Sequence, residues 1–386
     1  MSNLKNFEPN IVLEEKIRLD LNNPSLYLDY ANWLNENGQA EFATFITKCC
    51  EQKFRPEVLS WDPVKNGLDE MAFSMIGSRD YMTGKVRKWR YGFVQNHSIV
   101  SLYKLEELTD TLQLPFFNFL ESINVAYQNL HELFEFFKNW EGLKYLKRLN
   151  IWDDGYMNGS GLGDLNLLLP QLEKIQYLYL VGNQCHDYIK DERTGEGNYV
   201  EIEIEKIYLP EVLHFGRIST NLSKSELDRI TNAYWPKLEA LTLCVGIDSE
   251  LKAEDFSEFF KGENLKSLKD LAIRNCVDVD DVLVLLLNSP LLPQLKRVSF
   301  YNSDLTSKGA QILLENKSKF SHLEDINIRQ TMLTEEDEAN LVAEFSSIEK
   351  YNVFREEGEV PDEELIFGEH FWEALSGEDA EDMDAF

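Results

Sequence analysis

Basic residues are scarce in this chain of 386 residues. Lysine and arginine together number 38 against 68 aspartates and glutamates, which gives a formal net charge of −30 at pH 7. Nucleic acids and anionic membranes are bound through their phosphates by lysine and arginine, so this balance argues against both as partners. Two interpretations stay open: the acidity keeps an abundant cytosolic protein soluble, or it attracts a basic protein partner.

Cysteine is also rare, and the five cysteines form no recognisable set. Their spacing contains no C-x-x-C pair and no even framework, which favours free thiols in a reducing cytoplasm. Long apolar runs are missing as well, since the longest, Val282 to Leu287, is far short of the roughly 20 residues that a membrane span requires. Residues 1–16 carry charges and lack an apolar stretch, so we expect no secretory signal.

Signatures of catalysis, cofactor binding and metal binding are weak or missing. The glycine-rich segment 159–163 has the spacing GxGxG rather than GxGxxG, and no GK[ST] motif follows it. The six histidines lack metal-ligand spacing. Cys185 and His186 are neighbours only in sequence, whereas a catalytic dyad needs adjacency in space. The sequence therefore predicts a protein that is not an enzyme and has no cofactor and no metal site.

What the chain does contain is one short pattern, repeated eight times: an apolar residue, two variable residues, an apolar residue, one variable residue and a third apolar residue. The copies are Leu120-Ile123-Val125, Leu146-Leu149-Ile151, Ile175-Leu178-Leu180, Leu238-Leu241-Leu243, Leu268-Leu271-Ile273, Leu295-Val298-Phe300, Leu323-Ile326-Ile328 and Ile348-Tyr351-Val353. Their starts lie 26, 29, 63, 30, 27, 28 and 25 residues apart, and the interval of 63 holds a poorer copy, Leu209-Val212-His214. A fixed period of this length predicts an array of stacked units, each too small to bury its own apolar face.

The pattern also predicts which face each residue occupies. Alternate residues of a strand point to opposite sides, so the fourth and sixth positions of each copy point together into a core. The residues between them are often polar, unlike those of a sheet that is buried on both faces. Apolar residues at helical spacing follow several copies, in segments 280–292, 305–314 and 334–345.

This period, with a strand and a helix in each unit, resembles the ribonuclease-inhibitor type of leucine-rich repeat. Asn183 and Cys276 stand at position nine, where such repeats carry a polar residue or a cysteine. The resemblance implies an α/β fold: a leucine-rich repeat solenoid with parallel strands on the concave face and helices on the convex face. The poorer copy follows a long polar stretch, Cys185 to Tyr199, and there we expect an irregular repeat with an inserted loop.

The first 55 residues have a different character, with apolar residues at helical spacing. Asn23-Pro24 is typical of a helix start and Gly38 of a helix end. Segment 26–46 resembles the bacterial repeat-companion domain, a small helical module that precedes leucine-rich repeats, and Arg90–Ile99 resembles the entry into the repeats in the same family. The module usually has an aspartate before its tryptophan, where this chain has Asn32. The resemblance depends on Leu28, Tyr30, Ala31, Trp33, Leu34, Gly38, Glu41, Phe42 and Ile46.

Four segments are predicted along the chain: a helical module at 1–55, a connector and N-terminal cap at 56–89, the repeat solenoid at 90–354 and an acidic tail at 355–386. Between Glu356 and Phe386 lie thirteen acidic residues and no lysine or arginine. We expect this tail to be solvated and largely mobile. The alternative is that the tail, with Phe367, Phe371 and Trp372, folds back onto basic residues of the repeats.

Under this register the third, fifth and seventh positions form the exposed wall of the array. Two groups on this wall combine arginine with aromatic residues, the types enriched at interface hot spots. The first group contains Arg148, Trp152, Tyr177 and Tyr179, and the second contains Arg274, Arg297, Tyr301 and Arg329. The structural alternative is that the aromatic rings pack sideways along the sheet and that the arginines pair with Asp270 or Asp325.

The hypothesis for function is a non-catalytic scaffold that binds a protein partner on the concave face. Two alternatives stay open. One is an immunity or inhibitor protein that neutralises a basic toxin or enzyme, because opposite electrostatic fields speed encounter. The other is a structural subunit of a larger assembly. We expect a cytoplasmic protein that binds neither nucleic acid nor membrane, and its oligomeric state is left open.

Overall fold

The computed structural model describes residues 9–51, 85–102, 104–153, 161–183, 186–190, 197–246 and 248–348. Most of the predicted connector, residues 56–84, and the whole predicted tail with Phe367, Phe371 and Trp372 lie outside these residues. The chain divides into two compact units. The first contains residues 1–127 and 139–149, and the second contains residues 128–138 and 150–386.

Three helices open the first unit: α1 (Ile11–Leu19), α2 (Pro24–Glu36) and α3 (Ala40–Glu51). The Asn23 side chain accepts a hydrogen bond from the Ser25 amide at 3.1 Å. Pro24, which has no amide hydrogen to leave unpaired, is the first helical residue of α2. Gly38, with a φ of 82°, follows the end of α2 in a left-handed conformation. The helix predicted between these signals is confirmed.

The strands of the first unit are β1 (Lys85–Arg90), β2 (Phe93–Leu102) and β3 (Ser122–Tyr127). A tight turn at Tyr91 and Gly92, both with positive φ, joins β1 to β2 as an antiparallel pair. β2 and β3 are parallel, and α5 (Leu105–Leu112) and the 3-10 helix η2 (Pro115–Phe117) lie in the crossover between them. Another 3-10 helix, η3 (Glu141–Tyr145), belongs to the later segment of this unit.

A buried carboxylate links the helices of the first unit to the segment that leads into β3. Glu14 is 4% exposed, and its Oε1 accepts hydrogen bonds from the Tyr30 hydroxyl and the Asn118 amide, both at 2.9 Å. Arg18 donates to the other oxygen of Glu14 and to the Asn118 backbone oxygen. Since a buried charge is tolerated only when it is paired and hydrogen-bonded, this cluster fixes α1 against α2 and the chain before β3.

The second unit is built on a sheet with the strand order β4-β5-β8-β9-β10-β11-β12. Neighbouring strands from β5 to β12 in this order are parallel, and parallel strands need a crossover connection. Helical segments lie in these connections from β8 to β12. The first two residues of β4 are counted in the first unit. The strands are β4 (Arg148–Asp153), β5 (Tyr177–Val181), β8 (His214–Ile218), β9 (Ala240–Cys244), β10 (Asp270–Arg274), β11 (Arg297–Ser299) and β12 (Asp325–Asn327).

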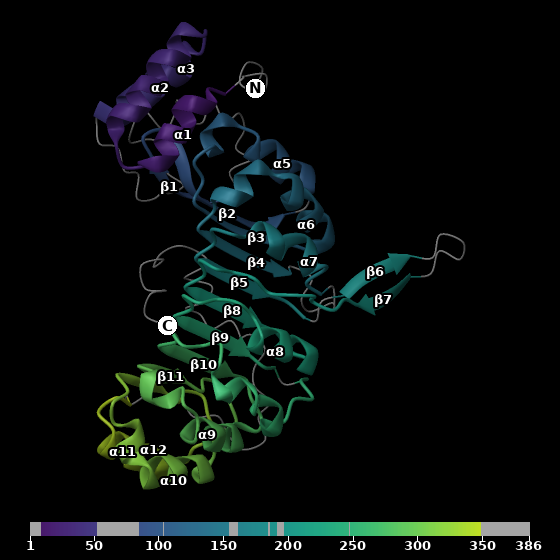
Figure 1. Cartoon of the computed structure of the whole chain (residues 1–386), viewed down its shortest axis with the longest axis vertical. Coiled ribbons are helices and arrows are strands. Elements are labelled where there is room, and N and C mark those ends of the chain that lie inside the picture. The colour runs from purple at the N-terminus through teal and green to yellow at the C-terminus, as the bar shows by residue number, and fades with distance from the viewer. Residues whose placement is uncertain are drawn as a thin grey trace. The chain divides into compact units, whose positions relative to one another are not determined.

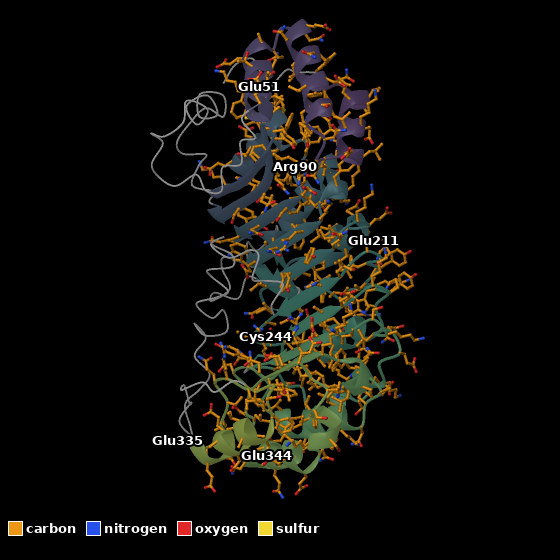
Figure 2. The ribbon with its side chains drawn as sticks, turned by 90° about the vertical axis from the view of Figure 1, so that its left-hand side faces the viewer. Glu51, Arg90, Glu211, Cys244, Glu335 and Glu344 are labelled. Carbon is orange, nitrogen blue, oxygen red and sulfur yellow. The ribbon has the colours of Figure 1, made fainter. Side chains whose placement is uncertain are left out.

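In the described part of the chain, a helical segment follows each of these strands except β5, and Figure 1 shows α8 and α9 beside the strands. The α-helices are α6 (Leu130–Asn139), α7 (Leu165–Leu168), α8 (Lys224–Thr231), α9 (Val279–Leu287), α10 (Ser307–Glu315), α11 (Lys317–Phe320) and α12 (Glu335–Glu344). Short 3-10 helices are η5 (Leu169–Gln171), η6 (Ala253–Phe256), η7 (Phe259–Lys261) and η8 (Leu292–Gln294). Glu335 and Glu344, labelled in Figure 2, mark the two ends of α12.

The helices predicted in segments 280–292, 305–314 and 334–345 are confirmed as α9, α10 and α12. Thr306 caps α10, because its hydroxyl accepts a hydrogen bond from the Lys308 amide at 3.2 Å. Thr334 and Asp337 form a capping box at the start of α12, in which each side chain accepts a hydrogen bond from the backbone amide of the other. Local sequence signals thus decide where these helices begin.

Hydrogen bonding aligns equivalent positions of the repeated pattern in adjacent strands. Leu271 pairs with Leu241 on one side and Val298 on the other, and Val298 pairs with Ile326. These four residues, all at the fourth position, are 1–2% exposed. The predicted alternation is therefore confirmed from β9 to β12. The result is an α/β fold with a parallel sheet and helices, which fits a repeat solenoid.

The stretch in which an inserted loop was expected forms a separate β-hairpin. β6 (His186–Lys190) and β7 (Gly197–Glu201) pair antiparallel, with His186 opposite Glu201 and Lys190 opposite Gly197. The hairpin is a two-stranded sheet of its own and does not join the parallel sheet (Figure 1). The expectation of an insertion between two repeats is confirmed, because β5 pairs directly with β8 across it.

The register predicted for the poorer copy, Leu209-Val212-His214, is wrong. Sheet pairing places Arg217 beside Leu180, so the sixth position of this repeat is Arg217 and not His214. The prediction failed because an arginine stands where every other copy has an apolar residue. Apolar spacing alone therefore places this copy three residues too early in the sequence.

Arg217 is 2% exposed, and its polar contacts are all internal. Its Nε and Nη2 donate to Oε1 of Glu226, in the first turn of α8, at 3.0 and 2.9 Å. Its Nη1 donates to the backbone oxygens of Gly182 and Ile218 at 2.6 and 2.8 Å, and Nη2 donates to that of Asn183 at 2.9 Å. One buried arginine thereby joins the ends of β5 and β8 to the start of α8, with its charge paired and its donors satisfied.

Replacement of Arg217 by methionine is expected to lower the free energy of unfolding by about 3–5 kcal/mol, because Glu226 is left buried without its partner. Arg229→Met is the matched control. Arg229 lies on α8, the helix that carries Glu226. Its side chain is 40% exposed and pairs with Glu203 at 3.7 Å, so its loss should cost less than about 1 kcal/mol. Urea denaturation measures both, and equal losses would contradict the structural role assigned to Arg217.

Candidate functional site

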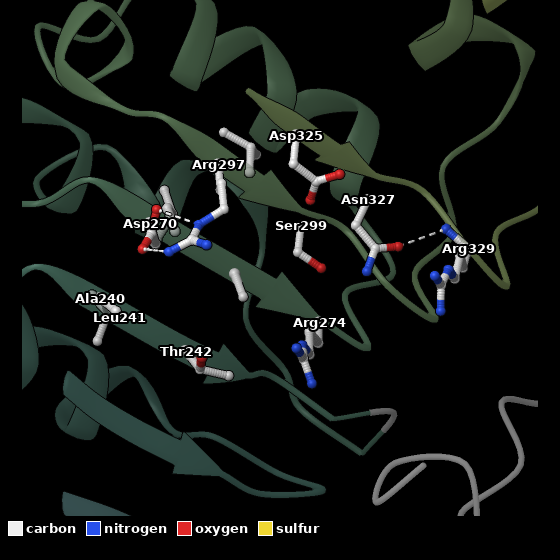
Figure 3. Close-up of a pocket in the computed structure, with 13 residues that line it drawn as sticks. Ala240, Leu241, Thr242, Asp270, Arg274, Arg297, Ser299, Asp325, Asn327 and Arg329 are labelled. Carbon is white, nitrogen blue, oxygen red and sulfur yellow. Dashed lines mark hydrogen bonds and ion pairs between the residues drawn. The ribbon is translucent and has the colours of Figure 1, made fainter. Parts of the chain in front are cut away.

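Strands β9 to β12 carry a polar pocket on the face formed by their third, fifth and seventh positions. Its volume is about 240 Å³, and its floor includes the small side chains of Ala240, Thr242, Ala272 and Ser299. These residues stand in adjacent columns of the sheet, so longer side chains toward the strand ends form the rim (Figure 3). We name this face of β9–β12 the pocket face.

The rim at the N-terminal ends of the strands contains a neutral ion pair. Arg297 donates two hydrogen bonds to the Asp270 carboxylate, from Nε at 2.9 Å and from Nη2 at 2.7 Å. The sheet register places these two residues side by side on β10 and β11. The hydrogen bonds to Asp270 raise the pKa of Arg297 above its ordinary value. The alternative that arginines of the second predicted group pair with neighbouring aspartates is therefore confirmed for Arg297.

The rim at the C-terminal ends carries a cation that lacks a counterion within the described residues. Arg274, at the seventh position of β10, is half-buried and forms no ion pair with them, and its Nε is enclosed without a hydrogen-bond partner. Burial lowers the pKa of Arg274. Its guanidinium carbon lies 5.6 Å from the centre of the Tyr301 ring, within the range of a cation–π contact. This charge is partly desolvated, and the described residues compensate it only in part.

Tyr301 and Arg329 lie near Arg274 at the same rim. Burial raises the pKa of the Tyr301 hydroxyl, and the charges of Arg274 and Arg329 act on it in the opposite direction. The Arg329 amide donates to Oδ1 of Asn327 at 3.1 Å, as Figure 3 shows. The structure thus places three members of the second predicted group near one another, and the fourth, Arg297, at the opposite rim of the same pocket.

A ladder of left-handed residues turns the chain at this rim, and it was not predicted from the sequence. Asn275, Asn302 and Gln330 occupy position eight of consecutive repeats, with φ angles of 51°, 53° and 54°. Asn302 Nδ2 donates to Asn275 Oδ1 at 3.2 Å, while the Asn275 and Asn302 amides donate to the backbone oxygens of Tyr301 and Arg329. Asparagine tolerates positive φ better than most residues, so its recurrence 27 residues apart was the available signal.

Two rings of the first predicted group pack against the neighbouring strand. The centre of the Tyr177 ring lies 4.8 Å from that of His214. The Tyr179 ring covers Gly216, where an added Cβ would lie 2.2 Å from the nearest ring atom. Both rings therefore pack sideways along the sheet, which confirms the structural alternative for this pair.

Several positions predicted on the exposed wall are buried. Trp152 is 5% exposed, Asn150 is 3% exposed and Cys244 is 1% exposed, so the prediction of exposure is wrong for them. Alternation decides which face of the sheet a residue occupies, but packing along that face decides whether water reaches it. Arg148, the remaining member of the first group, begins β4 in the first unit and is half-buried, and its amide donates to the Glu121 backbone oxygen at 3.0 Å.

The described residues offer no metal cluster and no membrane-spanning helix. No group of three or more histidine, cysteine, aspartate or glutamate residues among them could hold a metal ion. None of their helices is both long and apolar enough to cross a membrane. Gly161 and Gly163, the part of the glycine-rich segment that they include with Leu162, both have a φ of 64°. A Cβ at Gly163 would lie 2.8 Å from the His131 amide nitrogen, so this glycine permits a close backbone approach.

Gly216→Ala is expected to lower the free energy of unfolding by about 1–3 kcal/mol, because the added methyl group overlaps the Tyr179 ring. Tyr179→Ser in the same chain should recover most of that loss, since it removes the overlapping ring. A double-mutant cycle measured by urea denaturation tests this coupling. If the two changes are additive, the ring is not the reason for the glycine.

Arg274→Gln should leave the free energy of unfolding unchanged or raise it, because the substitution removes a desolvated charge that has no counterion among the described residues. Arg297→Gln should lower it by about 1 kcal/mol, because Asp270 loses its partner. Thermal and urea unfolding of the two variants beside the wild type provide the comparison. A larger loss for Arg274→Gln than for Arg297→Gln would make Arg274 a structural residue.

Comparisons with known proteins add little to this description. No protein-family model matches the sequence, and no curated protein matches it. Among solved structures, the fold is similar to that of a Bacteroides fragilis protein determined by a structural genomics consortium, with a TM-score of 0.47 and 17% sequence identity. The match covers 71% of this chain and 91% of the other. A similarity of this level shows nothing about function.

Proposed function

We propose that this chain is a cytoplasmic leucine-rich repeat protein of the ribonuclease-inhibitor type, with an N-terminal repeat-companion module. We further propose that it is a non-catalytic scaffold that binds a protein partner on the pocket face. The observation that supports this function best is the pocket of about 240 Å³ on β9–β12, with the half-buried Arg274 at its rim.

The regularity of the repeats supports the proposed family. Equivalent residues of β9, β10, β11 and β12 are paired in parallel register, and they are 30, 27 and 28 residues apart in sequence. A left-handed residue recurs at position eight after β10, β11 and β12. Repetition of this kind is what an array of stacked units requires, because each unit buries its apolar face only against its neighbours.

The chemistry of the pocket face supports recognition of a protein. Arginine and tyrosine are enriched at interface hot spots, because they combine a large contact area with directional hydrogen bonds. Arg274, Tyr301 and Arg329 supply these types at one rim. The small floor residues, Ala272 and Ser299 among them, allow a partner side chain to approach the sheet closely. Binding at this face needs no catalytic group.

Inhibition of a basic toxin or enzyme is an alternative function, and the acidity of the chain favours it. The net charge of −30 would speed encounter with a basic protein through long-range attraction. That attraction concerns the whole surface, whereas the C-terminal rim of the pocket is positive. The two ideas therefore predict different contacts, and mapping the contact on the protein separates them. A structural subunit of a larger assembly stays an alternative without a supporting feature among the described residues.

Site-specific photocrosslinking tests the proposed function. A benzoylphenylalanine side chain at Ser299 places the reactive group in the pocket, and one at Val284, an exposed residue of α9, serves as the control on the helical side. Irradiation in an extract of the cells that make the protein should yield a crosslinked protein from position 299 and none from position 284. Equal yields at the two positions would remove the pocket face from the proposal.

Charge reversal gives an independent test with a matched control. Arg274→Glu combined with Arg329→Glu should lower recovery of the crosslinked protein by about tenfold or more, as expected when hot-spot residues are lost. Lys261→Glu combined with Lys317→Glu changes the net charge equally, at exposed positions that pair with Glu258 and Glu344. That control should keep full recovery. Equal losses in the two double variants would show that only the total charge matters.

A further inference from the structure

The two rims of the pocket differ in charge. Arg297 and Asp270 neutralise each other at the N-terminal strand ends, where Asp325 also lines the pocket. At the C-terminal strand ends the lining residues with charge are Arg274 and Arg329. The described part of this rim is therefore positive, although the chain as a whole is strongly negative. A ligand that fits the pocket has to bring negative charge to one end of it.

Arg274 is the residue that most needs a partner. Among the described residues, its Nε is enclosed without a hydrogen-bond acceptor, and the guanidinium has Tyr301 as its aromatic neighbour and no carboxylate in an ion pair. A desolvated cation without a counterion is unfavourable in the isolated protein. A bound anion removes that cost, because charge-assisted hydrogen bonds to a planar guanidinium are among the strongest in proteins. The contrast with Arg217, whose donors all have acceptors, shows that the fold is able to satisfy an arginine where it is structural.

Neutral hydrogen-bond donors lie in the same half of the pocket. The Ser299 oxygen accepts a weak hydrogen bond from the Tyr301 amide at 3.4 Å, so its own hydrogen is free to be donated. Asn327 uses its Oδ1 to accept from the Arg329 amide, and its Nδ2 donates no hydrogen bond within the described residues. Figure 3 shows Asn327 between Ser299 and Arg329, with Arg274 below Ser299. Two neutral donors beside the Arg274 guanidinium suit a ligand that only accepts hydrogen bonds, as a carboxylate does.

The pocket, with a volume of about 240 Å³, is large enough to admit a side chain of a partner. A carboxylate on a flexible side chain is able to reach the C-terminal rim while its methylene groups lie against Ala272 and the other small floor residues.

We propose that Arg274, together with Arg329, Ser299 and Asn327, forms a subsite for a carboxylate carried by an acidic segment of a protein. This inference rests on the proposed function and names the chemistry of the contact. The acidic partner segment inserts one aspartate or glutamate side chain, and its carboxylate accepts hydrogen bonds from the Arg274 guanidinium. The rest of the negatively charged surface repels acidic segments, so recognition depends on this local positive rim.

A pair of peptides tests the subsite directly. A fluorescent, end-capped peptide with two central glutamates is compared with the same peptide carrying glutamines, by fluorescence anisotropy with the full-length protein. Salt at about 0.15 M limits long-range repulsion to a screening length of about 8 Å. The glutamate peptide should bind about tenfold more tightly, the preference expected of a charge-assisted contact. The negative net charge acts against this preference, so a preference for glutamate has to come from a local site.

Three variants identify the residue. Arg274→Gln should reduce the preference to less than about twofold while the melting temperature stays equal or rises. Arg274→Lys keeps the charge but loses the planar set of N–H donors, so it should retain part of the preference for the glutamate peptide. Arg229→Gln, at an exposed position of α8, removes the same charge and should leave the preference intact. An equal loss in Arg274→Gln and Arg229→Gln would overturn the assignment to Arg274.

Two further measurements distinguish a carboxylate on a protein segment from a free dicarboxylate and from the acidic tail of the chain itself. Glutarate, a free dicarboxylate, should compete only weakly, and competition as strong as that of unlabelled glutamate peptide would overturn the proposal of a protein segment. A full-length chain with the thirteen tail carboxylates changed to amides removes competition from residues 356–386. A preference for glutamate in either chain supports the subsite, and its absence from both overturns it. The peptide preference and the crosslink at position 299 are independent, so a subsite without a crosslinked partner would count against the proposed function alone.

Discussion

Parallel hydrogen bonding between neighbouring strands is the constraint on which the second unit depends. It places the fourth position of one repeat beside the fourth position of the next, as with Leu241, Leu271 and Val298, so apolar side chains meet apolar side chains. A single repeat would expose the face that it buries in the array. The same register places the small residues Ala272 and Ser299 side by side on adjacent strands, on the other face of the sheet, and both line the pocket.

Two arginines of the second unit differ in how the fold compensates their charge. Arg217 stands in the core, where Glu226 and backbone oxygens satisfy its donors. Arg274 stands at the end of β10, half-buried beside an aromatic ring, without a counterion among the described residues. Burial makes an unpaired charge costly, and the proposed carboxylate subsite depends on this cost at Arg274.

Much of the second unit could be predicted from local signals. Alternation predicted the buried positions of β9–β12, and apolar residues at helical spacing predicted α9, α10 and α12. The poorer copy could not be placed, because Arg217 fills an apolar position and its partner Glu226 is recognisable only in space. The exposed wall was predicted less well. The packing of the Tyr179 ring, for example, depends on Gly216, a residue of the next strand.

The sequence by itself determined the period, the alternation of faces, the helix starts and the acidity of the chain, because each depends on residues close together in sequence or on composition alone. Only the tertiary structure decided which arginines have partners. Arg297 meets Asp270, and Arg274 meets Tyr301, across 27 residues of chain in each case. Such contacts are set by strand register and by the direction of each side chain at the sheet surface, which no local pattern of residues specifies.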